Sequence, residues 1–320
     1  MPSVTTPVFD LSGARVWVAG HRGMVGSAVI RRLAAEPVEA VLTVDRSGLD
    51  LRRQAEVEAW VQQNRPDVVV LAAAKVGGIL ANDRFPADFL YDNLAIQNAI
   101  IKASADVGVK KLLFLGSSCI YPKFAAQPIA EESLLTGPLE PTNQWYAIAK
   151  IAGIMLCDAL RQQHGLDFIS AMPTNLYGPG DNYDLQASHV IPALIRKAIA
   201  ARDAGAPSMT VWGSGTPRRE FLYVDDLADA LVFLLRRFSG AGPINVGTGT
   251  DVTIAELAQT VADAAGFRGS LVFDTSKPDG TPRKLMDGSR LAAMGWTARI
   301  GLHEGLARTI ADLPAGFGRG

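Results

Sequence analysis

The sequence has little cysteine, almost no excess of charge of either sign, and no long uninterrupted apolar run. Its two cysteines, Cys119 and Cys157, are too few for a disulfide framework. The 31 basic and 32 acidic residues form no basic stripe of the kind that nucleic acid requires. No apolar stretch approaches a membrane span, and the first residues lack the features of a signal peptide. We therefore expect a cytoplasmic protein with free thiols that binds neither nucleic acid nor membrane.

The remaining composition is that of an ordinary globular protein. Hydrophobic residues make up 48% of the chain and charged residues 20%, which excludes an intrinsically disordered chain. A chain of 320 residues can bury a substantial core and folds as one large domain or two unequal ones.

Short apolar runs alternate with helical patterns through the first half of the chain. Strands are predicted at 14–20, 40–45, 67–74, 111–118 and 167–178, and helices at 24–36, 51–64, 86–107 and 146–164. Nearly continuous apolar strands that alternate with helices indicate a parallel sheet covered on both faces, with right-handed connections. The expected fold is α/β, a Rossmann-type doubly wound parallel sheet followed by a smaller C-terminal α/β domain.

This alternation changes after residue 178, where "GPGDNYDLQAS" predicts a loop. Further elements are expected as a helix at 189–202, a strand at 208–213, a strand–turn–helix unit at 221–238 and a strand at 243–249. We assign residues 1–177 and 217–246 to the larger domain, and residues 178–216 and 247–320 to the smaller one.

The loop "GHRGMVG" lies between the first predicted strand and helix. Its glycines let the backbone turn tightly and approach a pyrophosphate at the helix N-terminus. The G-x-x-G-x-x-G spacing alone also fits a simple turn, and the surrounding strand–helix–strand pattern is what favours dinucleotide binding. The predicted cofactor contacts in this loop are Gly20, His21, Arg22, Gly23, Met24, Val25 and Gly26.

Residues after the second predicted strand give conflicting indications about the dinucleotide. Asp45 lies 19 residues after Gly26, where a carboxylate binds the adenosine ribose of NAD. Arg46 and Arg22 can together bind a 2′-phosphate and favour NADP, although Asp45 repels that phosphate unless it turns away. The alternative for Arg46 is a solvated surface charge, so the residues themselves leave NAD and NADP open.

Tyr146 and Lys150 are four residues apart near the start of a predicted helix and share one of its faces. We expect the ammonium to lower the phenol pKa from its usual value of about 10. Tyr146 can then donate a proton to a carbonyl oxygen while a hydride reaches the carbon, and Ser117 or Ser118 can bind that oxygen. The alternatives are ordinary packing for the Tyr–Lys pair and strand-end capping for the serines.

"GHRGMVG", "GSS" and "YAIAK" together resemble the extended short-chain dehydrogenase/reductases. Longer strings resemble the GDP-L-fucose synthase family within that group, from about residue 15 to residue 296; they are "AAAKVGGILAN", "LGSSCIYPK", "EPTNQWYAIAKIAG", "MPTNLYGPGDN", "SHVIPALIRK", "WGSGTPRREFL" and "KPDGTPRKLMD". The resemblance implies NADPH as cofactor, GDP-4-keto-6-deoxy-D-mannose as substrate, no metal, and a homodimer joined through helices of the Rossmann domain. The implied reaction epimerises C3 and C5 and then reduces the C4 ketone to give GDP-L-fucose.

The same resemblance assigns catalytic residues. It implies that Cys119 and His189 form the acid–base pair of epimerisation, and that Ser117, Tyr146 and Lys150 serve reduction, with Lys150 tuning Tyr146. Ser117 and Tyr146 are also implied to hold the enolate oxygen. An imidazolium is expected to tune the Cys119 thiol. The alternative for Cys119 is a small buried core residue, which is also our interpretation of Cys157. Further implied cofactor contacts are Arg46, Tyr146, Lys150, Asn175 and His189.

The implied substrate contacts follow in the second half of the chain. They are Lys197, Trp212, Arg219, Asp279 and Lys284. Trp212 is either an exposed ring for a guanine or ribose or a core residue. Three features depart from the family: Lys197 replaces a common arginine, Asp45 opposes an NADP preference, and the tail at 313–320 replaces a final helix and is expected to be disordered.

Two rival functions are compatible with the same motifs. One is another nucleotide-sugar 4-reductase or epimerase with the same fold, which has no need of the Cys119–His189 pair. The other is a non-catalytic dinucleotide sensor, which has no need of an intact Ser117, Tyr146 and Lys150 set.

Overall fold

The computed structural model of the chain describes residues 8–184, 188–277, 279–314 and 317. Most of the C-terminal tail whose disorder was predicted lies outside these residues. Within them, no helix combines the length and the apolarity needed to cross a bilayer.

The larger part of the molecule is a six-stranded sheet in which every pairing is parallel. Its strands, in spatial order, are β10 (Pro243–Val246), β5 (Phe168–Pro173), β4 (Lys111–Leu115), β3 (Val68–Leu71), β1 (Arg15–Ala19) and β2 (Ala40–Leu42). The chain changes direction across the sheet between β1 and β3, and ligands of such folds bind at the strand ends beside this switch point. The predicted Rossmann-type sheet is confirmed.

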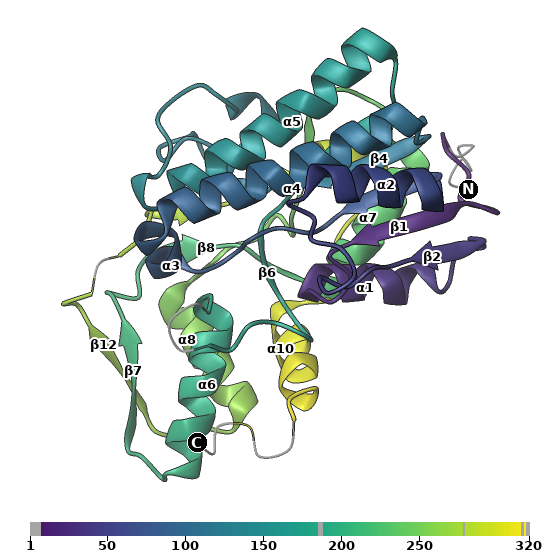
Figure 1. Cartoon of the computed structure of the whole chain (residues 1–320). Helices are drawn as coiled ribbons and strands as arrows, with labels where there is room; N and C mark the ends of the chain where they lie inside the picture. Colours follow the sequence, from purple (N-terminus) through teal and green to yellow (C-terminus); the bar gives the residue numbers. More distant parts are fainter. Residues whose placement is uncertain (1–7, 185–187, 278, 315–316, 318–320) are drawn as a thin grey trace.

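Alternation along the strands explains why both faces are covered. In β1, Val16 and Val18 point into one apolar cluster, whereas Trp17 and Ala19 point into the other. The first face is packed by α1 (Met24–Leu33) and α7 (Val224–Arg237), and the second by α2 (Gln54–Asn64), α4 (Pro86–Val107) and α5 (Gln144–His164) (Figure 1). Cys157 is fully buried on the second face, as predicted for a core residue.

A second group of elements extends from the carboxyl ends of the sheet (Figure 1). Its helices are α6 (Val190–Asp203), α8 (Ile254–Ala265) and α10 (Leu302–Ala311), and they share a third apolar cluster. Its strands pair as β6 (Asn175–Tyr177) with β9 (Phe221–Tyr223), β7 (Ser208–Trp212) with β12 (Ser270–Asp274), and β8 (Arg218–Arg219) with β11 (Val252–Thr253) and β13 (Arg283–Lys284). We propose that this group corresponds to the smaller domain assigned to 178–216 and 247–320, with the addition of β6, β8 and β9, which lie in residues assigned to the larger domain.

Several short elements connect the two groups. They are α3 (Ile79–Arg84), α9 (Ser289–Ala293) and the 3-10 turns η1 (Ser118–Ile120), η2 (Glu131–Ser133) and η3 (Pro141–Asn143). Leu291 of α9 and the nearby Trp296 pack in the first-face cluster of the sheet. This C-terminal segment therefore packs against the larger group, although the chain around it belongs to the smaller one.

Glu220, between β8 and β9, ties the two groups together. Its fully buried carboxylate accepts hydrogen bonds from the backbone N–H groups of Thr248 at 2.7 Å, Gly249 at 2.8 Å and Met286 at 3.1 Å. A buried carboxylate is tolerated when several donors satisfy it. These bonds fix the chain on either side of Glu220, including Arg219, and the segment that follows β13.

Candidate active site

A single cavity of roughly 1570 Å³ runs from the glycine-rich loop, past the ends of β4 and α5, to α6 and β8. Every residue predicted as a cofactor, catalytic or substrate contact lines it. Pockets for one small ligand usually occupy about 300–1,000 Å³. The cavity is therefore large enough for a dinucleotide and a second nucleotide-sized ligand together.

The glycine-rich loop requires glycine at two positions in this structure. Gly20 has φ +91°, and a Cβ there would lie 2.7 Å from the backbone of Ala73. A Cβ on Gly26 would lie 2.1 Å from the carbonyl oxygen of Gly20. The loop after β1 thus packs directly on the chain after β3, and α1 begins immediately afterwards at Met24. This brings a helix N-terminus to the switch point, where a pyrophosphate is favoured.

Asp45 is paired with the glycine-rich loop. Its Oδ2 lies 2.6 Å from Nη2 of Arg22, and its Oδ1 lies 3.1 Å from Nε2 of His21. The neighbouring Arg46 is exposed and also lines the cavity. Asp45, the carboxylate expected to repel a 2′-phosphate, is therefore held by Arg22, one of the two arginines predicted to bind that phosphate.

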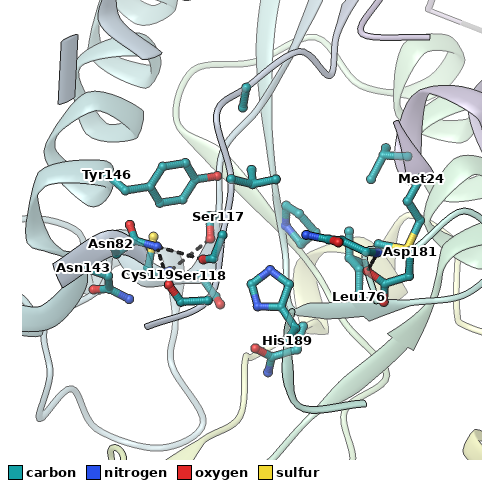
Figure 2. Close-up of a pocket in the computed structure, with 18 of the residues that line it drawn as sticks. Met24, Asn82, Ser117, Ser118, Cys119, Asn143, Tyr146, Leu176, Asp181 and His189 are labelled. Atoms are coloured by element: carbon teal, nitrogen blue, oxygen red, sulfur yellow. Dashed lines mark hydrogen bonds between the residues drawn. The ribbon is translucent and has the colours of Figure 1, made fainter. Parts of the chain in front are cut away.

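The predicted catalytic residues meet where β4 ends. Ser117 Oγ accepts the backbone N–H of Cys119 at 3.4 Å at the start of η1, and Cys119 is 7% exposed. Lys150 Nζ donates to the carbonyl oxygen of Leu115, the last residue of β4, at 2.8 Å. Figure 2 shows Tyr146, Ser117 and Cys119 on one side of the cavity and His189 facing them from the other.

The expected effect of Lys150 on Tyr146 is wrong for this structure. Burial raises the pKa of Tyr146 well above its usual value, with a smaller contribution from Cys119. Burial also lowers the pKa of Lys150 to about 8. The ammonium is directed at the Leu115 carbonyl and lies 5.7 Å from the centroid of the Tyr146 ring. Tyr146 is therefore a protonated phenol at neutral pH, as a proton donor must be.

The expected tuning of Cys119 by an imidazolium is also wrong for this structure. Burial raises the pKa of the Cys119 thiol, and the largest opposing influence is the Lys284 ammonium, ahead of Ser117 and Lys150. Burial lowers the pKa of His189, so its imidazole is neutral near pH 7. A thiol and a neutral imidazole face each other in the resting protein.

The other end of the cavity carries cations and an exposed tryptophan. Trp212 is 53% exposed, so it is not a core residue. Lys197 Nζ lies 4.8 Å from the Trp212 ring centroid and donates to the carbonyl oxygen of Thr210 at 3.1 Å. Burial lowers the pKa values of Arg219 and Lys284, the paired residues of β8 and β13.

Asp279 has a different setting from these cations. Its Oδ1 accepts the Ser214 backbone N–H at 3.0 Å, and its Oδ2 accepts the Ser214 hydroxyl at 2.7 Å. These bonds hold the turn after β7 beside Trp212. The carboxylate thus fixes part of the cavity wall in addition to lining it.

Sequence reasoning did not single out two amides in the wall, Asn82 and Asn143. Both lie in strings that carry the family resemblance, "AAAKVGGILAN" and "EPTNQWYAIAKIAG". Neither has a charge, a titratable group or a recurrent spacing that marks it. Only the folded chain brings them beside Cys119 and Tyr146 (Figure 2).

Comparison with known proteins agrees with this geometry. The model of the NAD dependent epimerase/dehydratase family matches residues 16–247. The chain is 60% identical to the GDP-L-fucose synthase of Sinorhizobium fredii over 95% of this chain and 96% of that protein. It is 58% identical to GDP-L-fucose synthase 1 of Arabidopsis thaliana over 92% of each. A crystal structure of a GDP-L-fucose synthetase from Naegleria fowleri bound to NADP superimposes with a TM-score of 0.87 at 31% identity, covering 96% of this chain and 95% of that one.

The protonation of Cys119 can be measured by alkylation. In Cys157→Ala protein, we expect the iodoacetamide rate to rise with pH through a midpoint above about 8.5, the value of a free thiol. Burial raises the thiol pKa, so the thiolate fraction at pH 7.5 lies below that of a free cysteine. Lys284→Met removes the main opposing charge and is expected to raise the midpoint further.

Protein that lacks both cysteines is the blank for this experiment. A midpoint below about 8.5, or one that falls when Lys284 is replaced, contradicts the effect of burial and of the Lys284 charge on the Cys119 thiol.

Proposed function

This chain belongs to the NAD dependent epimerase/dehydratase family, and from that premise we propose that it is a GDP-L-fucose synthase. It epimerises C3 and C5 of GDP-4-keto-6-deoxy-D-mannose and reduces the C4 ketone with NADPH. The observation that carries the proposal is one cavity in which Ser117, Tyr146 and Lys150 lie beside Cys119, with His189 opposite. A 4-reductase or C4-epimerase without epimerisation at C3 and C5 leaves the Cys119–His189 pair unexplained, and a dinucleotide sensor leaves the whole set unexplained.

The residues around the glycine-rich loop fit NADPH. Gly20 and Gly26 lie so close to neighbouring backbone that neither could carry a Cβ. The absence of side chains at these positions leaves space for a pyrophosphate at the N-terminus of α1. Arg22 and Arg46 are the cations that hold the 2′-phosphate. Asn175, Lys150 and His189 line the cavity farther along, toward the nicotinamide. When bound, NADPH supplies the hydride for C4.

Ser117 and Tyr146 act on the ketone oxygen. Tyr146 is a protonated phenol in a buried position, so it can give its proton to the oxygen that becomes negative during reduction. Ser117 supplies a second hydroxyl at the same position. Lys150, fixed by the Leu115 carbonyl, positions the start of α5 and can hold the ribose next to the nicotinamide.

Epimerisation uses the two faces of the sugar. A proton next to a ketone is acidic because the remaining charge is delocalised into an enolate. Cys119 and His189 lie on opposite sides of the cavity, so one can remove a proton from C3 or C5 while the other returns one from the opposite face. Ser117 and Tyr146 hold the enolate oxygen, so both reactions use one oxygen-binding site.

The nucleotide half of the substrate lies toward the smaller domain. Lys197 and Arg219 are positioned for the diphosphate, and the exposed Trp212 ring for the guanine or ribose. An ammonium binds phosphate as a point charge, so Lys197 makes a less directional contact than an arginine. Asp279 and Lys284 complete this part of the wall.

A second copy of the chain is the partner that the surface of α4 and α5 fits. These two helices pack side by side on the outer face of the molecule (Figure 1). Trp145, Ile148 and Met155 form an exposed stripe on α5, and Tyr91 of α4 is 70% exposed. Helix-to-helix pairing of this face in a homodimer covers the stripe.

The dimer has a direct test. Light scattering of the wild-type protein is expected to give twice the mass of one chain, and Ile148→Lys with Met155→Lys is expected to give a monomer. Monomeric wild-type protein at micromolar concentration rules out this interface. Glu304→Lys on α10, remote from α4 and α5, is the control for an added surface charge.

A cytoplasmic location accompanies this function. Both cysteines are free, as in proteins of a reducing compartment. Fractionation of the source cells checks this assignment.

The reaction can be followed by NMR in deuterated water. Wild-type protein with GDP-4-keto-6-deoxy-D-mannose and NADPH is expected to yield GDP-L-fucose, and without NADPH to exchange deuterium into C3 and C5. Cys119→Ser is expected to lower this exchange by at least about 10²-fold, because a hydroxyl is a far weaker acid–base group than a thiol. The variant then reduces the unepimerised ketone.

Cys157→Ser is the control, since it changes the other thiol outside the cavity. Reduction of the ketone by wild-type protein without exchange at either carbon identifies a simple 4-reductase. Full exchange by Cys119→Ser removes Cys119 from the acid–base pair.

Asp45 predicts a measurable effect on the choice of cofactor. Asp45→Asn frees Arg22 for the 2′-phosphate and removes the carboxylate that binds a 2′-hydroxyl. An exposed ion pair contributes up to about 1 kcal/mol, so we expect the ratio of kcat/KM for NADPH over NADH to rise by up to about fivefold. Asp106→Asn, at the exposed end of α4, is the matched control. An unchanged ratio shows that Asp45 does not compete for the cofactor phosphate.

A further inference from the structure

Asn82 is a buried amide whose oxygen has no hydrogen-bond partner among the described residues. It lies on the short helix α3, lines the cavity, and is 6% exposed. Its Oδ1 is shielded from solvent and accepts no hydrogen bond from residues 8–184, 188–277, 279–314 or 317. Buried polar atoms are nearly always satisfied, so an exception in a ligand cavity indicates a partner that arrives with the ligand.

The orientation of this amide is fixed by the backbone before α3. Asn82 Nδ2 donates to the carbonyl oxygen of Gly77 at 2.8 Å and to that of Gly78 at 3.1 Å. A flipped amide would place Oδ1 against these two carbonyl oxygens, which are themselves acceptors. The Asn82 oxygen is therefore an acceptor held in one direction.

A second amide oxygen lies next to it. Asn143 ends η3, against which α3 packs, and its buried Oδ1 likewise has no hydrogen-bond partner in the part of the chain that the structure describes. Figure 2 shows Asn82 and Asn143 side by side, next to Cys119 and on the same side of the cavity as Tyr146. Two acceptors without donors thus border the place where the acid–base residues meet.

We propose that Asn82 and Asn143 accept hydrogen bonds from the sugar hydroxyls of the substrate and so orient the ring between Cys119 and His189. This assignment rests on the proposed function. In a 4-keto-6-deoxy pyranose joined to a diphosphate through C1, only C2 and C3 carry hydroxyls. The ketone, the methyl group and the phosphates offer no donor at neutral pH, which leaves these two hydroxyls to match two acceptors.

The arrangement explains how the ring is positioned for exchange at C3. The hydroxyl on C3 shares its carbon with the proton that is removed, and the amide pair lies beside Cys119. A fixed acceptor for a hydroxyl therefore limits rotation of the ring relative to the thiol. Both asparagines are positioning residues for this step, and neither takes a proton.

Deoxy analogues of the substrate test the assignment. With wild-type protein, the 2-deoxy and 3-deoxy forms of the GDP-keto sugar are each expected to lose about tenfold in kcat/KM for reduction. Asn82→Ala is expected to lose about tenfold in kcat/KM with the natural substrate. It is also expected to use one of the two analogues as well as it uses the natural substrate. Asn143→Ala is expected to do the same for the other analogue. The Kd of NADPH, measured by fluorescence, stays unchanged in both variants.

If the loss in kcat/KM caused by each variant simply adds to the loss caused by each analogue, the amides and hydroxyls do not interact, and the proposal is overturned. A weaker NADPH Kd overturns it too and identifies the cofactor as the donor. Failure of wild-type protein to convert the keto sugar rejects the proposed function, whereas normal conversion with unchanged variants rejects this inference alone.

Asn93 provides the matched control for the removal of a buried amide. Its Oδ1 accepts the Lys75 backbone N–H at 2.9 Å, and its Nδ2 donates to the carbonyls of Lys75 and Phe89. Asn93→Ala is expected to lower the urea midpoint and to keep both analogue penalties. If Asn82→Ala does not fold, Asn143→Ala alone decides, because one of the two penalties must disappear with it.

Discussion

The hydrogen bond from Lys150 to the carbonyl oxygen of Leu115 is the interaction on which the active site depends. It joins α5 to the last residue of β4, so it fixes the helix that carries Tyr146 to the strand that leads into Ser117 and Cys119. The ammonium is buried, and burial lowers its pKa to about 8. A buried ammonium is retained only where a hydrogen bond offsets part of its lost hydration. The contact thus fixes the geometry at some expense of stability.

Around this contact, the sheet and the second group of elements each fix a different part of the cavity wall. The sheet brings the segments that follow β1, β3 and β4 to one edge. Gly20, after β1, lies so close to Ala73, after β3, that a Cβ would not fit between these two segments. Glu220 then holds the segment after β13 against the loop at 248–249. Of the proposed catalytic residues, Ser117, Cys119 and Tyr146 come from the sheet group, whereas His189 immediately precedes α6 of the other group. Arg219, a proposed substrate contact, is held in place by the buried carboxylate of its neighbour Glu220.

The sequence predicts the fold better than it predicts the chemistry of the site. Apolar periodicity gave the 86–107 helix with the bounds of α4, and it placed each strand of the parallel sheet. It missed α3, because six residues after a glycine pair are too few for a periodic pattern. No helix or strand was assigned after residue 249, although the capping box of Thr253 and Glu256 marks the start of α8.

The site shows a different kind of limit. Spacing along a helix brings Tyr146 and Lys150 together, but it contains no information about how deeply both are buried. Because desolvation exceeds the pair interaction, the direction predicted for the Tyr146 pKa was wrong. Asp45 is similar: the sequence places a carboxylate and two arginines near one cofactor, but only the fold shows that Asp45 pairs with Arg22.

One cause underlies these electrostatic results. Burial raises the pKa values of Tyr146 and Cys119 and lowers those of Lys150 and His189, so it opposes charge on all four groups. Before substrate arrives, Tyr146 and Cys119 are therefore neutral proton-bearing groups and His189 is neutral, whereas Lys150, with a pKa of about 8, is still mainly an ammonium near pH 7. In the proposed reaction, charge develops mainly on the substrate oxygen during enolisation and reduction, and the hydroxyls of Ser117 and Tyr146 are the groups proposed to bind that oxygen. At a buried position, oriented donors stabilise such a charge more strongly than water does. Burial therefore has two effects. It makes Cys119 a weak acid in the resting protein, and it strengthens the hydrogen bonds that the Ser117 and Tyr146 hydroxyls are proposed to donate to the substrate oxygen, which favours removal of the proton from the sugar.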